Sequence, residues 1–182
     1  MILSYPELRR AVSSHKIKFE PEISVDQIQL SSIELTLGNQ FTLIKKFDGL
    51  TLQPGRPIPE DIFEQRSSTE PFILEPDKFV LAMTHERVIM PNDMAAFIEG
   101  RSTYARFGLS IHATAPLIEP GWTGQIALEI KNDGPNKLCL TPWLDRVSQL
   151  IFFKLSSSVP KKITKPLLKY ANQKSARPRT MS

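Results

Sequence analysis

Residues 99–129 read EGRSTYARFGLSIHATAPLIEPGWTGQIALE, and their short apolar runs, broken by glycine and proline, give the strongest β signal in the chain. The segment begins with a turn at Gly100-Arg101-Ser102-Thr103. Glycine lets the backbone approach a ligand closely, arginine supplies a planar fork of donors, and two hydroxyls can donate to phosphate oxygens. The turn therefore suits phosphate binding, although the same residues also suit an ordinary surface loop.

The end of this segment predicts a half-buried strand. Residues 125–130 (QIALEI) alternate between polar or small and large apolar side chains, which is the period of a strand with one face on the core. Glu129 then lies opposite the core face. Taken alone it is a solvated strand residue, but a folded sheet could bring Ser102, Arg106 and Glu129 to one water molecule.

The rest of the chain predicts one mainly β domain with a short N-terminal helix. Ser4 and Glu7 have capping-box spacing, which favours a helix from about Tyr5 to Ser14. Alternating segments follow, with short strands expected at 79–83 and 88–90 and a proline-rich surface excursion from 48 to 76. Many short strands and 15 prolines indicate a distorted β-barrel or jelly-roll-like fold.

Composition excludes several classes of protein. No apolar run approaches the length of a membrane span, and the N-terminus lacks the layout of a signal peptide, so we expect a cytoplasmic protein without a membrane partner. The single cysteine, Cys139, excludes an internal disulfide, and its apolar neighbours predict that it is buried. The chain also lacks the paired cysteines of zinc nucleobase deaminases.

Five ordered motifs resemble the dCTP deaminase family of the trimeric dUTPase superfamily. The resemblance spans nearly the whole chain, and the ordered set is much more specific than any one motif. The matching stretches are SIELTLG at 32–38, GRSTYAR at 100–106, HATA at 112–115 with EPGWTG at 119–124 and LE at 128–129, RVSQL at 146–150, and KYANQ at 169–173.

The resemblance implies a dUTPase-type fold, a homotrimer with active sites between subunits, and zinc-independent hydrolytic deamination of dCTP to dUTP and ammonia. Glu129 would act as general base on the attacking water, Arg106 would orient it, and Ser102 would fix the water or the tetrahedral centre. Mg²⁺ would be carried by the triphosphate, without a metal site of the protein. The other implied substrate-binding residues are Arg101, Thr103, Ala113, Thr114, Ala115, Glu119, Trp122, Gln149, Lys169, Tyr170 and Gln173.

Within that set the resemblance implies distinct contacts. The phosphates would be held by the Gly-Arg-Ser turn, by Gln149 and by the tail. Residues 113–115 would meet the pyrimidine edge, and Trp122 would pack under the deoxyribose. Glu119 stands where dUTPases carry the aspartate that activates water for phosphate cleavage, which puts that second reaction in doubt. Glu34 likewise replaces an aspartate of the early motif.

The charge pattern divides the chain into a nucleotide-binding domain at 1–155 and a basic tail at 156–182. No acidic residue follows Asp145, while basic residues continue to Arg179. Such a tail could be a flexible end, a nucleic-acid arm or a lid over a polyphosphate. Ordering ten residues costs on the order of 10 to 20 kcal/mol, which only a ligand with several charged acceptors, such as a triphosphate, can offset. The KYANQ match therefore favours the lid.

Alternative functions remain open at this point. A bifunctional enzyme would also release pyrophosphate and give dUMP. A non-catalytic nucleotide-binding regulatory protein could use the same fold, although it would have no need for Ser102, Arg106 and Glu129 together. Nucleic acid is the least favoured partner.

Overall fold

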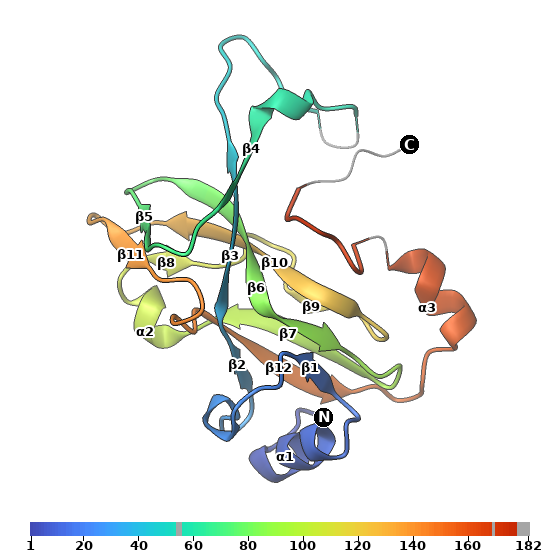
Figure 1. Cartoon of the computed structure of the whole chain (residues 1–182). Helices are drawn as coiled ribbons and strands as arrows, with labels where there is room; N and C mark the ends of the chain where they lie inside the picture. Colours follow the sequence, from blue (N-terminus) through green and yellow to red (C-terminus); the bar gives the residue numbers. More distant parts are fainter. Residues whose placement is uncertain (54–55, 169, 178–182) are drawn as a thin grey trace.

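A computed structural model describes residues 1–53, 56–168 and 170–177 of the chain. Its strands form a six-stranded sheet, a four-stranded sheet and a two-stranded sheet (Figure 1). The six-stranded sheet has the order β4 (Phe63–Ser67), β3 (Leu37–Ile44), β6 (Phe79–Ile89), β10 (Thr123–Asn132) and β8 (Leu109–Ser110), with β1 (Lys18–Glu20) also paired to β6. The four-stranded sheet has the order β2 (Ile33–Leu35), β12 (Ser148–Lys154), β7 (Met94–Gly100) and β9 (Leu117–Ile118), and the small sheet pairs β5 (Phe72–Leu74) with β11 (Leu138–Leu140).

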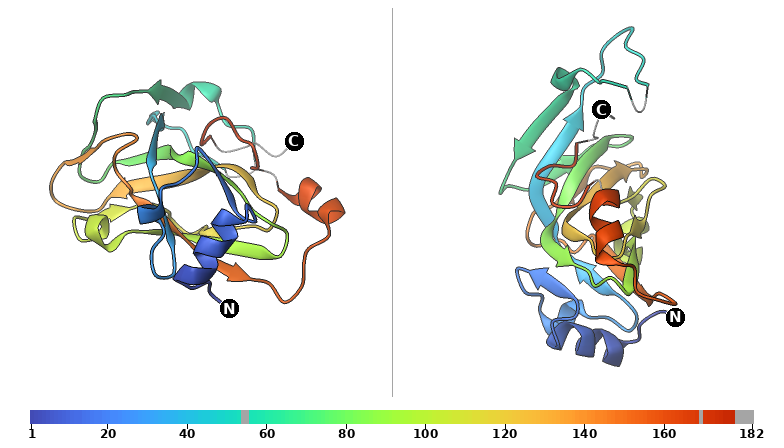
Figure 2. Two further views of the ribbon diagram at one scale, coloured as in Figure 1. Left: turned by 60° about the horizontal axis from the view of Figure 1, so that its bottom comes forward. Right: turned by 90° about the vertical axis from the view of Figure 1, so that its right-hand side faces the viewer.

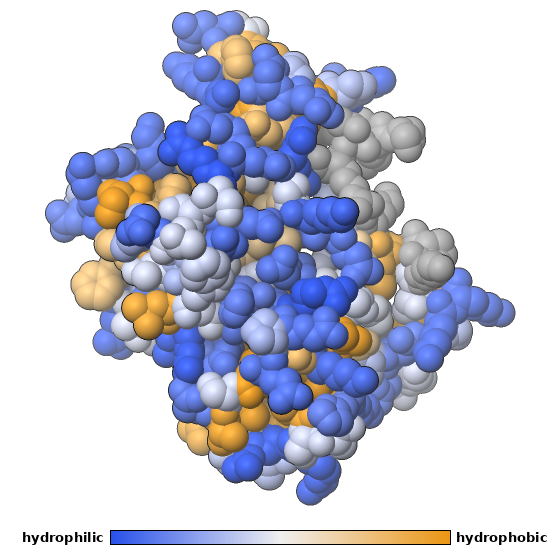
Figure 3. Space-filling view, in the orientation of Figure 1, coloured by the Kyte–Doolittle hydropathy of each residue, from blue (hydrophilic) through white to orange (hydrophobic). Residues whose placement is uncertain are grey.

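The two larger sheets share one apolar core. In β10, Ile126, Leu128 and Ile130 are buried while the intervening side chains are only partly covered, so the predicted alternation is confirmed. Facing residues such as Ile98 and Phe152 join the same cluster from the four-stranded sheet. The surface differs from this core. Figure 3 shows that one face of the molecule is largely hydrophilic, with apolar side chains in small separate patches.

The mainly β prediction is confirmed, but the sheets of the described residues are not closed into a barrel. β4 and β8 are the two edges of the six-stranded sheet, and neither pairs with a strand of the four-stranded sheet. The N-terminal helix α1 (Tyr5–Ser13) ends one residue earlier than expected. Its capping box is formed, because the Ser4 backbone N–H donates to Glu7 Oε2 at 3.2 Å. None of the helices described is long and apolar enough to span a membrane.

Two local predictions were wrong. The strands expected at 79–83 and 88–90 are one continuous strand, β6, because its polar middle is satisfied internally: Thr84 Oγ1 accepts the Ile126 N–H at 2.9 Å, and buried Glu86 accepts from Gln27 at 2.9 Å. Cys139 is exposed, not buried. It lies at the middle of β11, where the alternation turns Leu140 inward and leaves Cys139 beside exposed Ile73 on β5.

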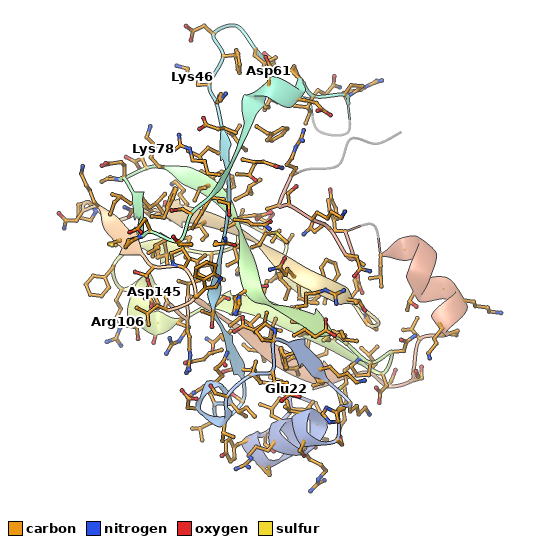
Figure 4. The ribbon with its side chains drawn as sticks, in the orientation of Figure 1. Glu22, Lys46, Asp61, Lys78, Arg106 and Asp145 are labelled. Carbon is orange, nitrogen blue, oxygen red and sulfur yellow. The ribbon has the colours of Figure 1, made fainter. Side chains whose placement is uncertain are left out.

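The proline-rich excursion begins as a projecting hairpin. The end of β3, the loop after it, the 3₁₀ helix η2 (Glu60–Ile62) and β4 extend away from the body of the molecule between Lys46 and Asp61 (Figures 1 and 4). We call residues 45–53 and 56–67 the arm. β4 pairs with β3 along five residues, from Gln40 opposite Ser67 to Ile44 opposite Phe63, which fixes the base of the arm to the six-stranded sheet.

The basic tail contains a helix that the sequence did not predict, α3 (Lys161–Leu167). A second short helix, α2 (Ser102–Ala105), follows the Gly-Arg-Ser turn. Figures 1 and 2 place α2 and α3 on opposite sides of the sheets, with the segment after α3 returning over the six-stranded sheet.

Candidate active site

A pocket of about 400 Å³ opens between β7, β9, β10 and the C-terminal segment. It brings together five of the residues proposed from the sequence, which come from three separate parts of the chain: Ala115, Trp122, Glu129, Tyr170 and Gln173. The rest of the lining is mainly apolar and adds His112 and Arg177 as polar groups. A mostly apolar pocket with a few converging polar groups is the usual form of a small-molecule site.

Glu129 is the acidic residue of the pocket lining, and its carboxylate is fixed by the neighbouring turn. The Ala113 backbone N–H donates to Glu129 Oε2 at 2.8 Å, and the Glu129 N–H donates to the Ile111 carbonyl at 2.9 Å. The strand therefore sets the backbone and the turn sets the side chain. The other carboxylate oxygen, Oε1, forms no hydrogen bond or ion pair with the described residues, so it is available to a ligand.

Trp122 forms one wall of the pocket. It is 9% exposed and belongs to the apolar core, and its indole Nε1–H donates to the Gly124 carbonyl at 3.1 Å. Gly121 before it has φ +75°, which favours glycine at this turn. Because the ring is both packed and hydrogen-bonded, it is a rigid surface on which a flat or furanose ring can rest.

His112 is a pocket residue to which the sequence gave little weight. Its Nε2 lies 3.2 Å from Glu99 Oε2 on β7, while Nδ1 is buried without a hydrogen-bond partner among the described residues. A carboxylate only accepts, so Nε2 carries the proton of this contact. The turn at 111–115 is thus tied to β7 through His112 and to β10 through Ala113. No sequence pattern indicated the contact between His112 and Glu99, because the two residues are 13 positions apart and belong to different parts of the fold.

The Gly-Arg-Ser turn lies elsewhere. Ser102, Thr103 and Arg106 are exposed on or beside α2 and do not line the pocket, and the Arg106 side chain makes no hydrogen bond or ion pair with the described residues. Figure 4 shows Arg106 beside α2, on the side of the molecule away from α3. Among the described residues, no hydrogen bond or ion pair joins Ser102 or Arg106 to Glu129.

The turn itself is held from beneath by an ion pair and by an amide. Arg101 pairs with Glu34, 7% exposed, at 2.6 Å and donates to the Arg146 carbonyl at 2.8 Å. Gln149 donates to the Gly100 carbonyl at 3.0 Å and accepts from Ser32 at 2.7 Å. Arg101 and Gln149, which were predicted to bind phosphate, therefore already support the backbone of the turn and of residues 102–106 after it.

α2 is anchored by Tyr104. Its hydroxyl donates to Asp145 Oδ1 at 3.0 Å, and Asp145 Oδ2 accepts the Thr141 N–H at 2.6 Å. Burial, together with this hydrogen bond to a carboxylate, raises the pKa of Tyr104 to about 12. The phenol therefore stays protonated and the anchor stays intact at neutral pH.

The remaining predicted residues divide between tail and turn. Tyr170 and Gln173 line the pocket, whereas Lys169 lies outside the described residues. Thr114 is exposed at the turn, and Glu119 is exposed and does not line the pocket. Within the described ranges no group of three or more His, Cys, Asp or Glu side chains could hold a metal ion.

Comparisons with known proteins agree on one family. A family model described as dCTP deaminase-like matches residues 2–155. The chain is 36% identical over 178 residues, 96% of this chain and 91% of the relative, to a protein of Dictyoglomus turgidum named "dCTP deaminase, dUMP-forming". It is 38% identical over 164 residues, 86% of this chain and 82% of the relative, to the dCTP deaminase of Haloarcula marismortui.

The fold agrees as well. The crystal structure of 2'-deoxycytidine 5'-triphosphate deaminase from Agrobacterium tumefaciens superimposes with a TM-score of 0.65 at 21% identity and covers 92% of this chain. The chain spans about half (52%) of that longer protein. Family match, identity along nearly the full length and fold together show that this chain belongs to the dCTP deaminase-like family.

Proposed function

We propose that this protein hydrolytically deaminates dCTP, and that Glu129 is the general base. The observation that carries the proposal is the Glu129 carboxylate, held by the Ala113 N–H at 2.8 Å inside the pocket with its second oxygen available. Relatives that share 36–38% of their residues with this chain are named dCTP deaminases, which supports the choice of substrate.

The chemistry follows from this position. Water attacks C4 of the cytosine ring and gives one proton to Glu129, which passes it to N3. The remaining hydroxyl proton then goes through Glu129 to the exocyclic amine as the C4–N bond breaks, and dUTP and ammonia leave. A carboxylate suits both steps because it accepts and then returns one proton. The backbone groups of residues 113–115 would meet the pyrimidine edge, and Trp122 would support the deoxyribose.

The catalytic set is completed by a neighbouring subunit. Ser102 and Arg106 are exposed, the Arg106 guanidinium has no partner among the described residues, and neither residue lines the pocket of its own chain. A head-to-tail homotrimer would bring α2 of one subunit to the Glu129 pocket of the next, because heterologous interfaces join two different surfaces of the same chain. Arg106 would then orient Glu129 and the water, and Ser102 would stabilise the developing tetrahedral centre.

Triphosphate binding follows from the same assembly. The exposed hydroxyls of Ser102 and Thr103 would donate to phosphate oxygens, with Arg101 and Gln149 fixing the turn beneath them. Mg²⁺ would accompany the nucleotide on its phosphate oxygens, as that ion prefers to keep water and phosphate ligands. A cytoplasmic location remains a prediction from the composition.

A second candidate is the bifunctional reaction that ends at dUMP. It is favoured by one observation: the relative covered over 91% of its length, and others, are named dUMP-forming. Cleavage would need a second activated water beside the phosphates. Glu119 is exposed at the turn before Trp122, so it could reach only a ligand that extends beyond the pocket of its own chain.

Product analysis tests both candidates. Purified protein is incubated with dCTP and Mg²⁺, and nucleotides, ammonia and pyrophosphate are measured together. Ammonia with equimolar dUTP supports the monofunctional deaminase, and ammonia with dUMP and pyrophosphate supports the bifunctional enzyme. Bound but unchanged dCTP would overturn the proposal and favour a regulatory nucleotide-binding protein.

A further inference from the structure

The C-terminal segment, residues 170–177, crosses the outer face of the six-stranded sheet. Ala176 is buried on that face against Leu81, Met83 and Ala127, apart from the main core. Just before Ala176, Lys174 and Ser175 border a second pocket of about 290 Å³ with side chains of β3 and β4. The segment therefore lines the Glu129 pocket and also approaches β3 and β4 at the base of the arm.

Strand register connects the two ends of this path. Glu129 lies opposite Leu81, Leu81 opposite Thr42, and Thr42 opposite Gln65, so these four residues form one row on one face of the sheet. Phe63 lies two residues before Gln65 in β4 and points to the same face. A segment that begins at the Glu129 pocket and follows the row thus ends over Phe63.

The segment is attached between two of the residues that line the pocket, Tyr170 and Gln173. The Asn172 N–H donates to the Thr123 carbonyl at 2.7 Å, and Arg87 donates to Asn172 Oδ1 at 2.5 Å. Gly124 permits this close passage: a Cβ added there would lie 2.8 Å from the Asn172 backbone nitrogen. Tyr170 and Gln173, on either side of Asn172, line the pocket.

The far end is held by the arm. The Arg177 guanidinium carbon lies 5.2 Å from the centroid of the Phe63 ring, and Arg177 also approaches Glu60 at 3.8 Å. Glu60 is 89% exposed, so that ion pair contributes little, and the contact with the ring carries most of the attraction. Phe63 is the fixed partner because β4 is paired to β3.

From this geometry we infer that Phe63 is a positioning residue of the active site: it holds Arg177 and thereby keeps Tyr170 and Gln173 at the pocket that contains Glu129. The inference rests on the proposed function and deepens it. The arm then holds the C-terminal segment, residues 170–177, as a lid over the pocket of the same subunit. We call the contact between Phe63 and Arg177 the clasp. Loosening the clasp weakens nucleotide binding and leaves the chemical step unchanged.

The test replaces Phe63 by Leu, which keeps an apolar side chain without the ring, and by Tyr, which keeps the ring. Phe47→Leu is the matched control, because Phe47 is 42% exposed on the same arm and makes no aromatic or cation–π contact with the described residues of the tail. Arg177→Ala is paired with Arg10→Ala, whose exposed side chain makes no ion pair with the described residues. KM and kcat for dCTP are measured for each, together with hydrogen exchange of residues 170–177.

Phe63→Leu is expected to raise KM about two- to five-fold, the factor that corresponds to loss of an exposed cation–π contact, with kcat unchanged. Arg177→Ala also removes a polar group of the pocket lining, so it should raise KM by at least that factor. The double variant is expected to match Arg177→Ala, since Phe63→Leu acts only through the contact with Arg177. Phe63→Tyr retains the wild-type KM, as do Phe47→Leu and Arg10→Ala. Tail exchange becomes faster in the same two variants and not in the controls.

Unchanged KM and unchanged tail exchange in Phe63→Leu would overturn the clasp. A fall in kcat alone, or an effect not restored by Tyr, would also overturn it, because it would show a general structural role. Hydrogen exchange needs no turnover. If the wild-type protein failed to deaminate dCTP while the variants still loosened the tail, the proposed function would be wrong and the clasp correct.

Discussion

The sharing of one active site between two subunits can be tested by mixing two inactive proteins. Glu129→Gln removes the proposed base, and Arg106→Ala removes the proposed orienting cation. The Arg106 side chain is exposed and makes no hydrogen bond or ion pair with the described residues, so its loss should not disturb the fold. The two variants are co-expressed with different affinity tags and purified over both, so that every trimer contains at least one subunit of each kind.

The expected activity follows from the geometry of a ring. In a head-to-tail trimer of either composition, 2:1 or 1:2, one interface joins an intact Glu129 to an intact Arg106. About one third of the sites are then wild type, and the doubly purified sample should show about one third of wild-type kcat per site with an unaltered KM. Each parent protein should lose about 10²-fold or more, the usual contribution of a positioned acid–base group.

Two results would refute this reasoning. If Glu129 and Arg106 act within one chain, every site in the mixed trimer lacks one of them, and the activity stays at the level of the parents. Restored activity in a sample that sediments as a monomer would contradict the assembly. Wild-type subunits carrying the same two tags are the control for the purification.

Three further predictions concern the tail, the Gly-Arg-Ser turn and α2. A chain that ends at Leu168 should bind dCTP more weakly while its thermal unfolding stays cooperative; unchanged affinity measured by calorimetry would count against the lid. Glu34→Ala leaves Arg101 unpaired in a mostly buried position, so urea unfolding should show a loss of about 2–3 kcal/mol, whereas no loss would mean that the pair is not supporting the turn. Because the pKa of Tyr104 is raised to about 12 from 10.0, the unfolded chain releases its proton first and stability falls as pH rises from 10 to 12; after allowance for partial exposure this is at most about 1 kcal/mol. Tyr104→Phe should lack this part of the fall in urea titrations, and identical pH curves would contradict the shift.

Much of the fold was predictable because it follows from local sequence patterns, namely hydrophobic alternation and helix-capping spacing. The alternation at 125–130 placed Glu129 opposite the core, and the spacing of Ser4 and Glu7 gave the first helix; both features depend on neighbours in sequence. β6 was divided wrongly because Thr84 and Glu86 look like a polar break. Their partners, Ile126 and Gln27, are distant in sequence, so nothing near Thr84 reveals that the polar groups are satisfied.

The site was predictable in its residues and less so in its arrangement. The motifs identified Glu129 and Arg106 as site residues but did not show that only Glu129 lines the pocket of its own chain. The relative position of the two residues depends on how the sheets pack, which a local motif does not encode. The sequence predicts Arg101 as a phosphate ligand, but in the structure its guanidinium is paired with Glu34 at 2.6 Å. The contact of Arg177 with Phe63 joins residues far apart in the sequence, and neither belongs to a recognisable motif.

The most direct test of the account compares wild-type protein with Glu129→Gln in a single turnover of dCTP, with ammonia release and dCTP binding measured on the same samples. Glutamine keeps an oxygen that can accept the Ala113 N–H, so the turn and the pocket should survive while the base is lost. The account predicts one ammonia per site from the wild type, no detectable ammonia from the variant, and dCTP affinities within a few fold of each other. Ammonia released by Glu129→Gln at the wild-type rate would show that another group takes the proton, and would contradict the account.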